Sequence, residues 1–112
     1  METLIHLIAD STTERETGLA VAENLLQDES GRIDTVAVVV QGPAIEAVEA
    51  DADAAGDVRD LVEAGVRVVA CENTLEGADL SASDLVDGVE TVPSGAVEAT
   101  QLQNDGFAYL RP

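Results

Sequence analysis

The feature that most constrains the fold is an alternation, along the whole chain, of short apolar runs with amphipathic stretches. The apolar runs are rich in β-branched residues and closed by polar residues, glycine or proline, which predicts buried strands. Between them, apolar residues recur at helical spacing after serine, threonine or asparagine, which predicts helices. The predicted strands span residues 4–8, 34–40, 66–70, 89–92 and 107–110.

Strands that alternate with helices form βαβ units, whose strands run parallel and whose crossovers are right-handed. The chain is therefore predicted to be an α/β protein, a three-layer α/β/α sandwich around a mostly parallel five-stranded sheet. Its 112 residues suit one compact domain, and no internal repeat or linker divides them. We expect residues 1–112 to form a single domain.

Local signals place the helices within this pattern. Ser11 lies three residues before Glu14, a capping-box spacing that starts a helix expected to stop at Gly31. The other helical signals are residues 44–49, residues 58–62 before Gly65, the cap-like pairs Asn73–Glu76 and Ser81–Asp84, and residues 96–105.

The charge of the chain is strongly one-sided, with 23 acidic residues, five basic residues and a formal net charge of −18. Such a surface repels nucleic acid and anionic lipid, so neither is expected as a partner. The acids either bind cations or basic partners, or adapt the chain to molar salt, where a Debye length of about 3 Å screens their repulsion. They are spread along the chain and the apolar content is an ordinary 46%, which favours salt adaptation and a halophilic source.

The composition, the length of the apolar runs and the first residues of the chain exclude several protein classes. A single cysteine cannot build a disulfide scaffold, and no apolar run approaches the roughly 20 residues of a membrane helix. The first residues lack the basic region of a signal peptide. We therefore expect a cytoplasmic protein whose thiol stays reduced.

Ligands of an open parallel sheet bind at the carboxyl ends of its strands. Cys71 follows the third predicted strand and is the only strong nucleophile at these ends. A helix that starts near Asn73 favours a thiolate at Cys71, whereas Glu72 and Glu76 oppose it. Cys71 is therefore either a reactive thiol or, like most free cysteines, a small buried packing residue.

Other candidate sites have weaker support in the sequence. His6 lies within an apolar run, which predicts a packed, hydrogen-bonded histidine rather than a partner of Cys71. Residues 51–56 begin like a calcium loop, but Ala55 and Val62 occupy positions that need oxygen ligands, so no metal site is predicted.

The predicted helix starts are the places where the chain could bind an anion or a nucleotide. Neither a Walker motif nor Gly-x-Gly-x-x-Gly is present, so the sequence gives no support for a nucleotide cofactor. Ser11 and Ser94 either cap helices or lie where helix amides hold an anion. Both alternatives are compatible with the sequence alone.

Several sequence blocks follow one another in an order that covers nearly the whole chain. They are Asn-Leu-Leu at 24–26, Gln-Gly-Pro-Ala-Ile at 41–45, Cys-Glu-Asn-Thr-Leu at 71–75, and Pro-Ser-Gly-Ala-Val at 93–97 leading to Gly-Phe-Ala-Tyr-Leu-Arg-Pro at 106–112. Together they resemble the DsrE family of small sulfur-relay proteins with the YchN-like fold, and within it an uncharacterised single-domain branch.

The resemblance implies a five-stranded parallel sheet in an α/β/α sandwich, and assembly into homotrimers or homohexamers. In active relatives, a cysteine in the loop after the third strand carries sulfur as a persulfide, and Cys71 matches that position. Asn73, Thr74 and the local backbone amides are then expected to position the sulfur. The wider set of binding candidates comprises Gln41, Gly42, Pro43, Ser94, Gly95 and Asp10.

The leading hypothesis is a small cytoplasmic sulfur carrier, a candidate sulfurtransferase without a metal or other cofactor. Cys71 would exchange sulfur with a donor and an acceptor protein. The alternative is a non-catalytic oligomeric module that binds a small ligand or serves assembly, with a structural Cys71. A thiol-reactivity assay distinguishes the two, because only the carrier needs an accessible thiol of lowered pKa.

Overall fold

A computed structural model describes the whole chain, residues 1–112, and each predicted strand is present within two residues of its expected bounds. The strands are β1 (Glu2–Leu7), β2 (Thr35–Val40), β3 (Arg67–Cys71), β4 (Glu90–Val92) and β5 (Ala108–Leu110). The α-helices are α1 (Thr12–Leu26), α2 (Ala55–Glu63), α3 (Glu72–Gly77) and α4 (Gly95–Asn104). Two 3₁₀ helices, η1 (Gly42–Val48) and η2 (Ala82–Asp84), complete the chain.

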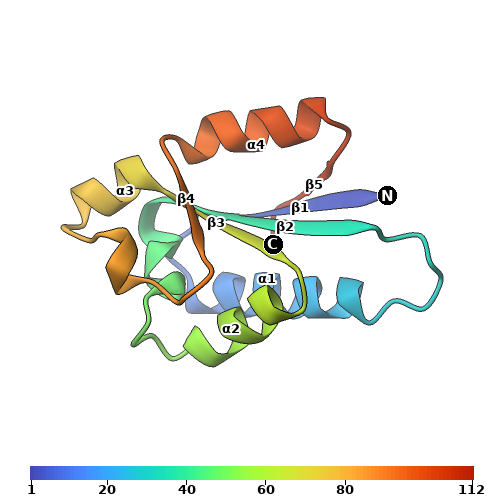
Figure 1. Cartoon of the computed structure of the whole chain (residues 1–112), viewed down its shortest axis with the longest axis horizontal. Coiled ribbons are helices and arrows are strands. Elements are labelled where there is room, and N and C mark those ends of the chain that lie inside the picture. Colours follow the sequence, from blue (N-terminus) through green and yellow to red (C-terminus); the bar gives the residue numbers. More distant parts are fainter.

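The strands form one fully parallel sheet in the order β4-β3-β2-β1-β5. α4 covers one face of the sheet, and α1 and α2 lie on the other (Figure 1). This arrangement confirms the predicted α/β/α sandwich. Because β4 and β5 form opposite edges, α4 crosses the sheet between them, and it begins at the carboxyl ends of the strands.

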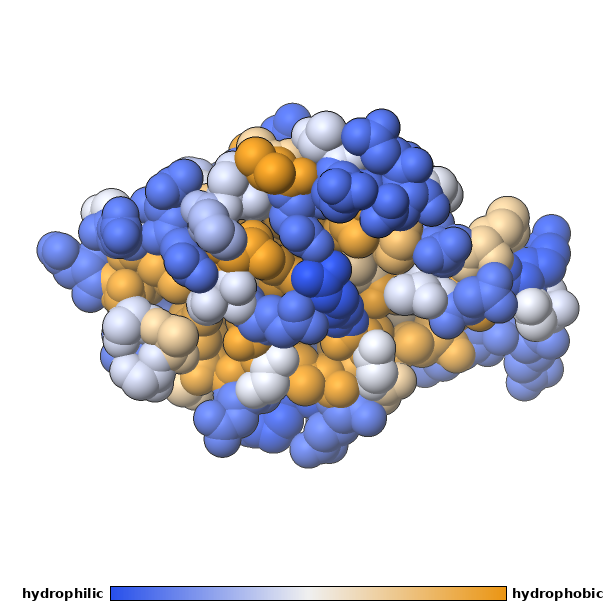
Figure 2. Space-filling view, turned by 45° about the horizontal axis from the view of Figure 1, so that its top comes forward, coloured by the Kyte–Doolittle hydropathy of each residue, from blue (hydrophilic) through white to orange (hydrophobic).

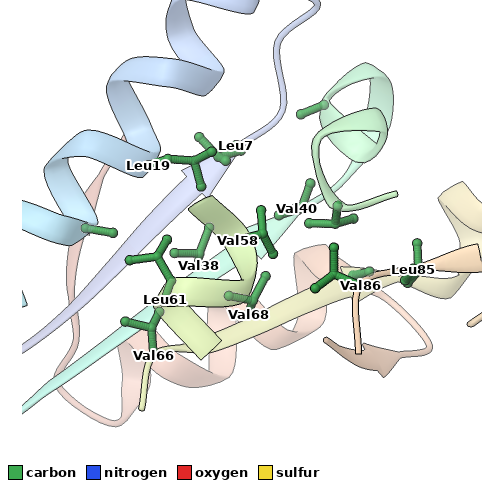
Figure 3. Close-up of a cluster of buried hydrophobic side chains, with 14 of the residues drawn as sticks. Leu7, Leu19, Val38, Val40, Val58, Leu61, Val66, Val68, Leu85 and Val86 are labelled. Atoms are coloured by element: carbon green, nitrogen blue, oxygen red, sulfur yellow. The ribbon is translucent and has the colours of Figure 1, made fainter. Parts of the chain in front are cut away.

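The core has two parts, one on each face of the sheet. The larger part packs the sheet against α1, η1 and α2, and Figure 3 shows Val58 and Leu61 of α2 lying over Val38 of β2. The smaller part packs the other face against α4 through Leu102. Residues 36–40 of β2 are at most 3% exposed, because strands flank β2 on both sides and helices cover both faces, which explains the continuous apolar run in the sequence.

α1 begins where the sequence predicts and ends earlier. Its N-cap is Ser11, whose hydroxyl accepts a hydrogen bond at 3.2 Å from a backbone amide in the first turn. The predicted stop at Gly31 is wrong, because the helix ends at Leu26. The Asp28 carboxylate accepts a hydrogen bond from the Ser30 amide at 3.2 Å, and such local bonds compete with helical ones.

α3 begins earlier than the sequence predicts. β3 passes directly into α3, so Cys71 is both the last residue of the strand and the N-cap of the helix. Asn73 therefore lies in the first turn of α3, and the predicted cap at Asn73 is wrong. The second predicted pair is confirmed, because Ser81 and Asp84 form a capping box around η2.

Arg67, the first residue of β3, connects this strand to β4 and α4. From β3 it donates hydrogen bonds to Glu90 in β4 at 3.0 Å and to Glu98 in α4 at 2.7 Å. Burial lowers the pKa of Arg67, but the hydrogen bonds to Glu98 and Glu90 outweigh it and raise the pKa overall. These bonds hold the first turns of α4 close to β3 and β4.

The surface reflects the acidic composition. Figure 2 shows one face on which hydrophilic side chains cover much of the molecule, with apolar side chains visible between them. The large apolar residues that are more than one-third exposed are Met1, Leu26, Val97, Tyr109 and Leu110. Two of them belong to β5, an edge strand that pairs only with β1. None of the helices is both long and apolar enough to cross a membrane.

Candidate functional site around Cys71

Cys71 lies at the carboxyl end of β3, on the sheet face that α4 covers. Alternate residues of a strand point to opposite faces, and Val69, two residues earlier, belongs to the core under α4. Only 4% of Cys71 is exposed. The thiol is thus held between the end of the sheet and the start of α4.

Cys71 is the N-cap of α3 and lies against Gly95, the first residue of α4. Burial raises the pKa of the thiol, but hydrogen bonds from the Gly95 amide, the Thr74 hydroxyl and the Thr74 and Asn73 amides outweigh it and hold the pKa below its ordinary value. The amides belong to the first turns of α3 and α4, so two helix N-termini converge on one sulfur. The glutamates of α3, which the sequence suggested would oppose the thiolate, are exposed and are not among the groups that shift this pKa.

Thr74 connects the thiol to the loop after β2. Its Oγ1 accepts a hydrogen bond from the Gly42 amide at 3.0 Å. The hydroxyl proton is then available to the Cys71 sulfur, and this interaction, after that of the Gly95 amide, lowers the thiol pKa. Gly42 has a φ of 60°, a left-handed conformation that favours glycine, and it turns the chain from β2 into η1.

Gly95 is the first residue of α4 and makes the close approach to the sulfur possible. Ser94 precedes it as the N-cap, with its hydroxyl accepting from the Val97 amide at 3.3 Å. A Cβ at position 95 would lie 2.9 Å from Gln41 Oε1 and 3.2 Å from Cys71 Cβ. Both distances are shorter than ordinary van der Waals contacts, so a Cβ here would require the flexible end of Gln41 and the Cys71 side chain to shift.

Gln41 links this site to two further residues. His6 Nε2 lies 2.9 Å from Gln41 Oε1, and His6 Nδ1 lies 2.6 Å from the Tyr109 hydroxyl oxygen. The prediction of a hydrogen-bonded His6 is confirmed, although the residue is half-buried rather than part of the core. Tyr109 is a further residue of this site that the sequence does not predict, because its place beside His6 depends on the pairing of β5 with β1.

The structure gathers some of the predicted binding residues and not others. Those that lie around Cys71 are Gln41, Gly42, Thr74 and Gly95, together with the amide of Asn73. Pro43 and Asp10 contact Arg15 instead: the guanidinium donates to the Pro43 carbonyl at 2.7 Å and lies 3.3 Å from the Asp10 carboxylate. Ser11 and Ser94 both act as helix caps.

Two surface depressions lie at the same end of the molecule. One, of about 410 Å³, lies between η1 and α3, and Gly42, Glu49 and Thr74 are among its lining residues. The other, of about 430 Å³, lies between α1, η1 and α2, where six acidic residues surround Arg15. No group of three or more His, Cys, Asp or Glu side chains is arranged to hold a metal ion.

The surroundings of Cys71 favour its thiolate form, so this residue can act as a nucleophile. Hydrogen bonds to the charged form of a thiol raise the thiolate fraction near neutral pH, and the thiolate is the nucleophilic form of cysteine.

A family model for DsrE/DsrF-like proteins matches residues 3–112. The chain belongs to the DsrE/DsrF-like family. Members of this family are generally sulfur-relay proteins, so the resemblance inferred from the sequence blocks is confirmed.

Solved structures support the same fold for this DsrE/DsrF-like chain. A protein of unknown function from Methanobacterium thermoautotrophicum is 30% identical, with a TM-score of 0.92 over 99% of this chain and 98% of that one. A conserved protein of unknown function from Bacteroides thetaiotaomicron is 16% identical, with a TM-score of 0.77 over 97% and 92%, and shares the fold alone. No curated protein matches the chain in sequence.

Proposed function

We propose that this DsrE/DsrF-like protein is a persulfide carrier in which Cys71 takes a sulfane sulfur from a donor and passes it to an acceptor thiol. The observation that carries the proposal is the position of Cys71, which ends β3, caps α3 and lies against the first residue of α4, so that Gly95, Thr74 and Asn73 lower its pKa. Hydrogen bonds to the charged form favour the thiolate, and the thiolate is the species that attacks sulfur. The sulfur-relay character of the family supports the same function.

The exchange consists of two displacements at sulfur and needs no external oxidant or reductant. The Cys71 thiolate attacks the outer sulfur of a persulfide or polysulfide donor; an S–S bond forms at Cys71 as the donor's S–S bond breaks, and the donor leaves as a thiolate. An acceptor thiolate then attacks that outer sulfur, and Cys71 leaves as a thiolate. The surrounding donors stabilise Cys71 as nucleophile in the first step and as leaving group in the second.

The burial of Cys71 favours small donors. With only 4% of the residue exposed, a linear inorganic polysulfide suits the site better than a bulky thiol. The depression between η1 and α3 reaches Thr74, which donates to the thiol, and offers a route of approach. The same burial supports the alternative function, a non-catalytic module in which Cys71 only packs.

Intact-mass spectrometry after incubation with inorganic polysulfide separates these functions. We expect the native chain to gain one sulfur atom that a reducing thiol removes. Cys71→Ser is the matched control, since it changes only sulfur to oxygen, and it should gain none. A folded native chain that gains no sulfur contradicts the carrier and leaves the packing role.

We propose further that the carrier forms homotrimers or homohexamers and meets a separate donor or acceptor protein. The free edge of β5, with Tyr109 and Leu110 more than one-third exposed, supports self-association, because exposed strand edges and apolar patches favour pairing with another chain. Light scattering in high-salt buffer tests this, and a monomer at micromolar concentration contradicts it.

A further inference from the structure

At the other end of β3 from Cys71, an ion pair connects this strand to the helix that covers the thiol. Arg67 is the first residue of β3 and Cys71 is the last. Arg67 Nη1 donates to Glu98 Oε1 at 2.7 Å, and Arg67 Nε donates to the two carboxylate oxygens of Glu90 at 3.0 and 3.2 Å. The Glu98 side chain is 20% exposed and that of Glu90 is 49% exposed. The contact between Arg67 and α4 is therefore the more buried of the two.

The two glutamates lie on either side of one turn. Glu90 belongs to β4 and Glu98 to the first turn of α4, and β4 leads through a short turn into α4, which folds back over the sheet (Figure 1). Val92 of β4 pairs with Cys71, and Gly95, three residues later, begins α4. One guanidinium group therefore holds both arms of the turn that brings Gly95 to Cys71.

Gly95 is the neighbour of Cys71 that depends on this turn. A Cβ at Gly95 would lie 3.2 Å from Cys71 Cβ, and the Gly95 amide is the group that lowers the thiol pKa most. Asn73 and Thr74 follow Cys71 directly in α3, so the local chain fixes their positions. Gly95 comes from a distant segment, so its contact with the thiol depends on where α4 begins.

Few buried apolar residues hold α4 on the sheet. The core beneath α4 contains six buried residues, compared with 19 on the other face, and α4 supplies Ala99 and Leu102 to it. Both follow the first turn of the helix, in which Val97 is 68% exposed. The bond from Glu98 to Arg67 thus fixes a turn that the core holds only weakly.

We infer that Arg67 is a positioning residue of the site, which acts through Glu98 to hold Gly95 against the thiol. This inference rests on the proposed carrier function, because sulfur exchange uses the thiolate that the contact with Gly95 favours. The link within α4 is direct: the Glu98 amide donates to the Ser94 carbonyl at 3.1 Å. A displacement of Glu98 therefore moves the start of the helix with it.

The midpoint of the pH profile of Cys71 alkylation tests the inference, with Glu98→Ala as the main variant. We expect the midpoint to rise by about half a pH unit, a roughly threefold loss of thiolate at lower pH, because the hydrogen bond from Gly95 is stretched rather than lost. A direct effect of charge has the opposite sign, since removing a carboxylate favours a nearby thiolate. A loosened α4 that exposes the thiol changes the rate at every pH and leaves the midpoint in place.

Glu90→Ala is the matched control, because it takes the other carboxylate from the same guanidinium and leaves the link to α4. Its midpoint should stay at the native value. Arg67→Met should raise the midpoint as Glu98→Ala does, and it carries the test should Glu98→Ala fail to fold. The double variant should show no further rise, since residues that act through one contact are not additive. Arg59→Met, the same change at an exposed position of α2, should leave the midpoint unchanged.

The outcomes separate the inference from the function on which it rests. An unchanged midpoint in folded Glu98→Ala overturns the inference, and so does an equal rise in Glu90→Ala, which would reflect a general loosening of the fold. Rises that add in the Arg67→Met/Glu98→Ala double variant overturn it as well, because Arg67 would then act independently of Glu98. A native chain that gains no sulfur from inorganic polysulfide overturns the carrier function, whatever the midpoints show.

Discussion

Two acidic groups of the chain, the Cys71 thiol and the Glu49 carboxyl, have pKa values that are shifted in opposite directions. The Cys71 thiol is buried, yet hydrogen bonds from Gly95, Thr74 and Asn73 hold its pKa below the ordinary value. Burial raises the pKa of Glu49, and the neighbouring carboxylates of Asp51, Glu46 and Asp84 raise it further. Both groups belong to one chain with a formal net charge of −18.

The difference shows that contacts, rather than net charge, decide ionisation at each position. Glu49 and Thr74 line the same depression, so the two regions experience similar distant charges. Around Glu49 the neighbours are anions that act through space and are screened by salt. Around Cys71 the groups that lower the pKa are uncharged N–H and O–H donors of Gly95, Thr74 and Asn73, whose short-range effect salt screens far less. Salt and point substitutions should therefore affect the two regions differently.

A change in salt concentration should produce the largest effect. It should change the stability of the fold rather than the pKa of the Cys71 thiol. Raising potassium chloride from dilute buffer to about 1 M shortens the Debye length to about 3 Å and removes repulsion among the surface acids. If screening recovers about 2 kcal/mol, the melting temperature rises by about 10 °C. The pKa of Cys71 should move little over the same series.

Thermal melts and thiol titrations at each salt concentration test that contrast. A melting temperature that stays flat means that the acids are not a salt adaptation and revives a role in binding a basic partner. A Cys71 pKa that follows the salt series means that charges, not hydrogen bonds, control the thiol.

Thr74→Val should weaken the Cys71 thiolate more than any other single change short of removing the cysteine. The variant loses the hydroxyl that donates to the sulfur and that accepts from the Gly42 amide. A hydrogen bond to a charged group contributes about 1.5 kcal/mol, so alkylation of Cys71 at neutral pH should slow about tenfold. Thr74→Ser keeps the hydroxyl and should retain the native rate; equal slowing in both variants would implicate packing instead.

Gly95→Ala should have a smaller effect with little loss of stability. The amide donor remains, but the added Cβ would lie 2.9 Å from Gln41 Oε1 and 3.2 Å from Cys71 Cβ, so both side chains must shift. We expect alkylation to slow about threefold, since a hydrogen bond that is stretched loses part of its roughly 1 kcal/mol. Gly56→Ala, where nothing lies within 4 Å, is the control. An unchanged rate in Gly95→Ala would show that the close approach is not needed.

Much of this architecture was predictable from local sequence, and the exceptions have physical causes. Continuous runs such as residues 36–40 identify buried parallel strands. Strand order depends on long-range pairing, so the contact between His6 and Tyr109 was not visible in the sequence. The predicted effect of Glu72 and Glu76 on Cys71 is wrong, because both side chains are exposed and neither is among the groups that shift the thiol pKa.

Glu49→Gln should produce the smallest change, and its sign follows from the raised pKa. A carboxyl whose folded-state pKa exceeds its unfolded value stabilises the fold below the unfolded pKa, and this stability is lost as pH rises through the folded pKa. Glutamine removes the ionisation, so the free energy of unfolding at neutral pH should rise by a few tenths of a kcal/mol after solvent screening, and the melting temperature should rise slightly with it. The gain should vanish in acid, where Glu49 is protonated in both states.

Glu76→Gln is the control for that comparison, because it removes the same charge from an exposed position. It should raise the melting temperature less than Glu49→Gln. Equal gains in the two variants would show that total charge, not the local crowding of carboxylates, sets the penalty at Glu49.

The most direct test of the account is the pH dependence of Cys71 alkylation in the native chain, compared with the same chain unfolded in denaturant. A folded-state pKa below the unfolded value predicts that the alkylation rate rises through a midpoint at lower pH in the native chain, because hydrogen bonds from Gly95, Thr74 and Asn73 outweigh burial. A native midpoint at or above that of the unfolded chain would contradict the account, since burial would then dominate and Cys71 would be a packing residue.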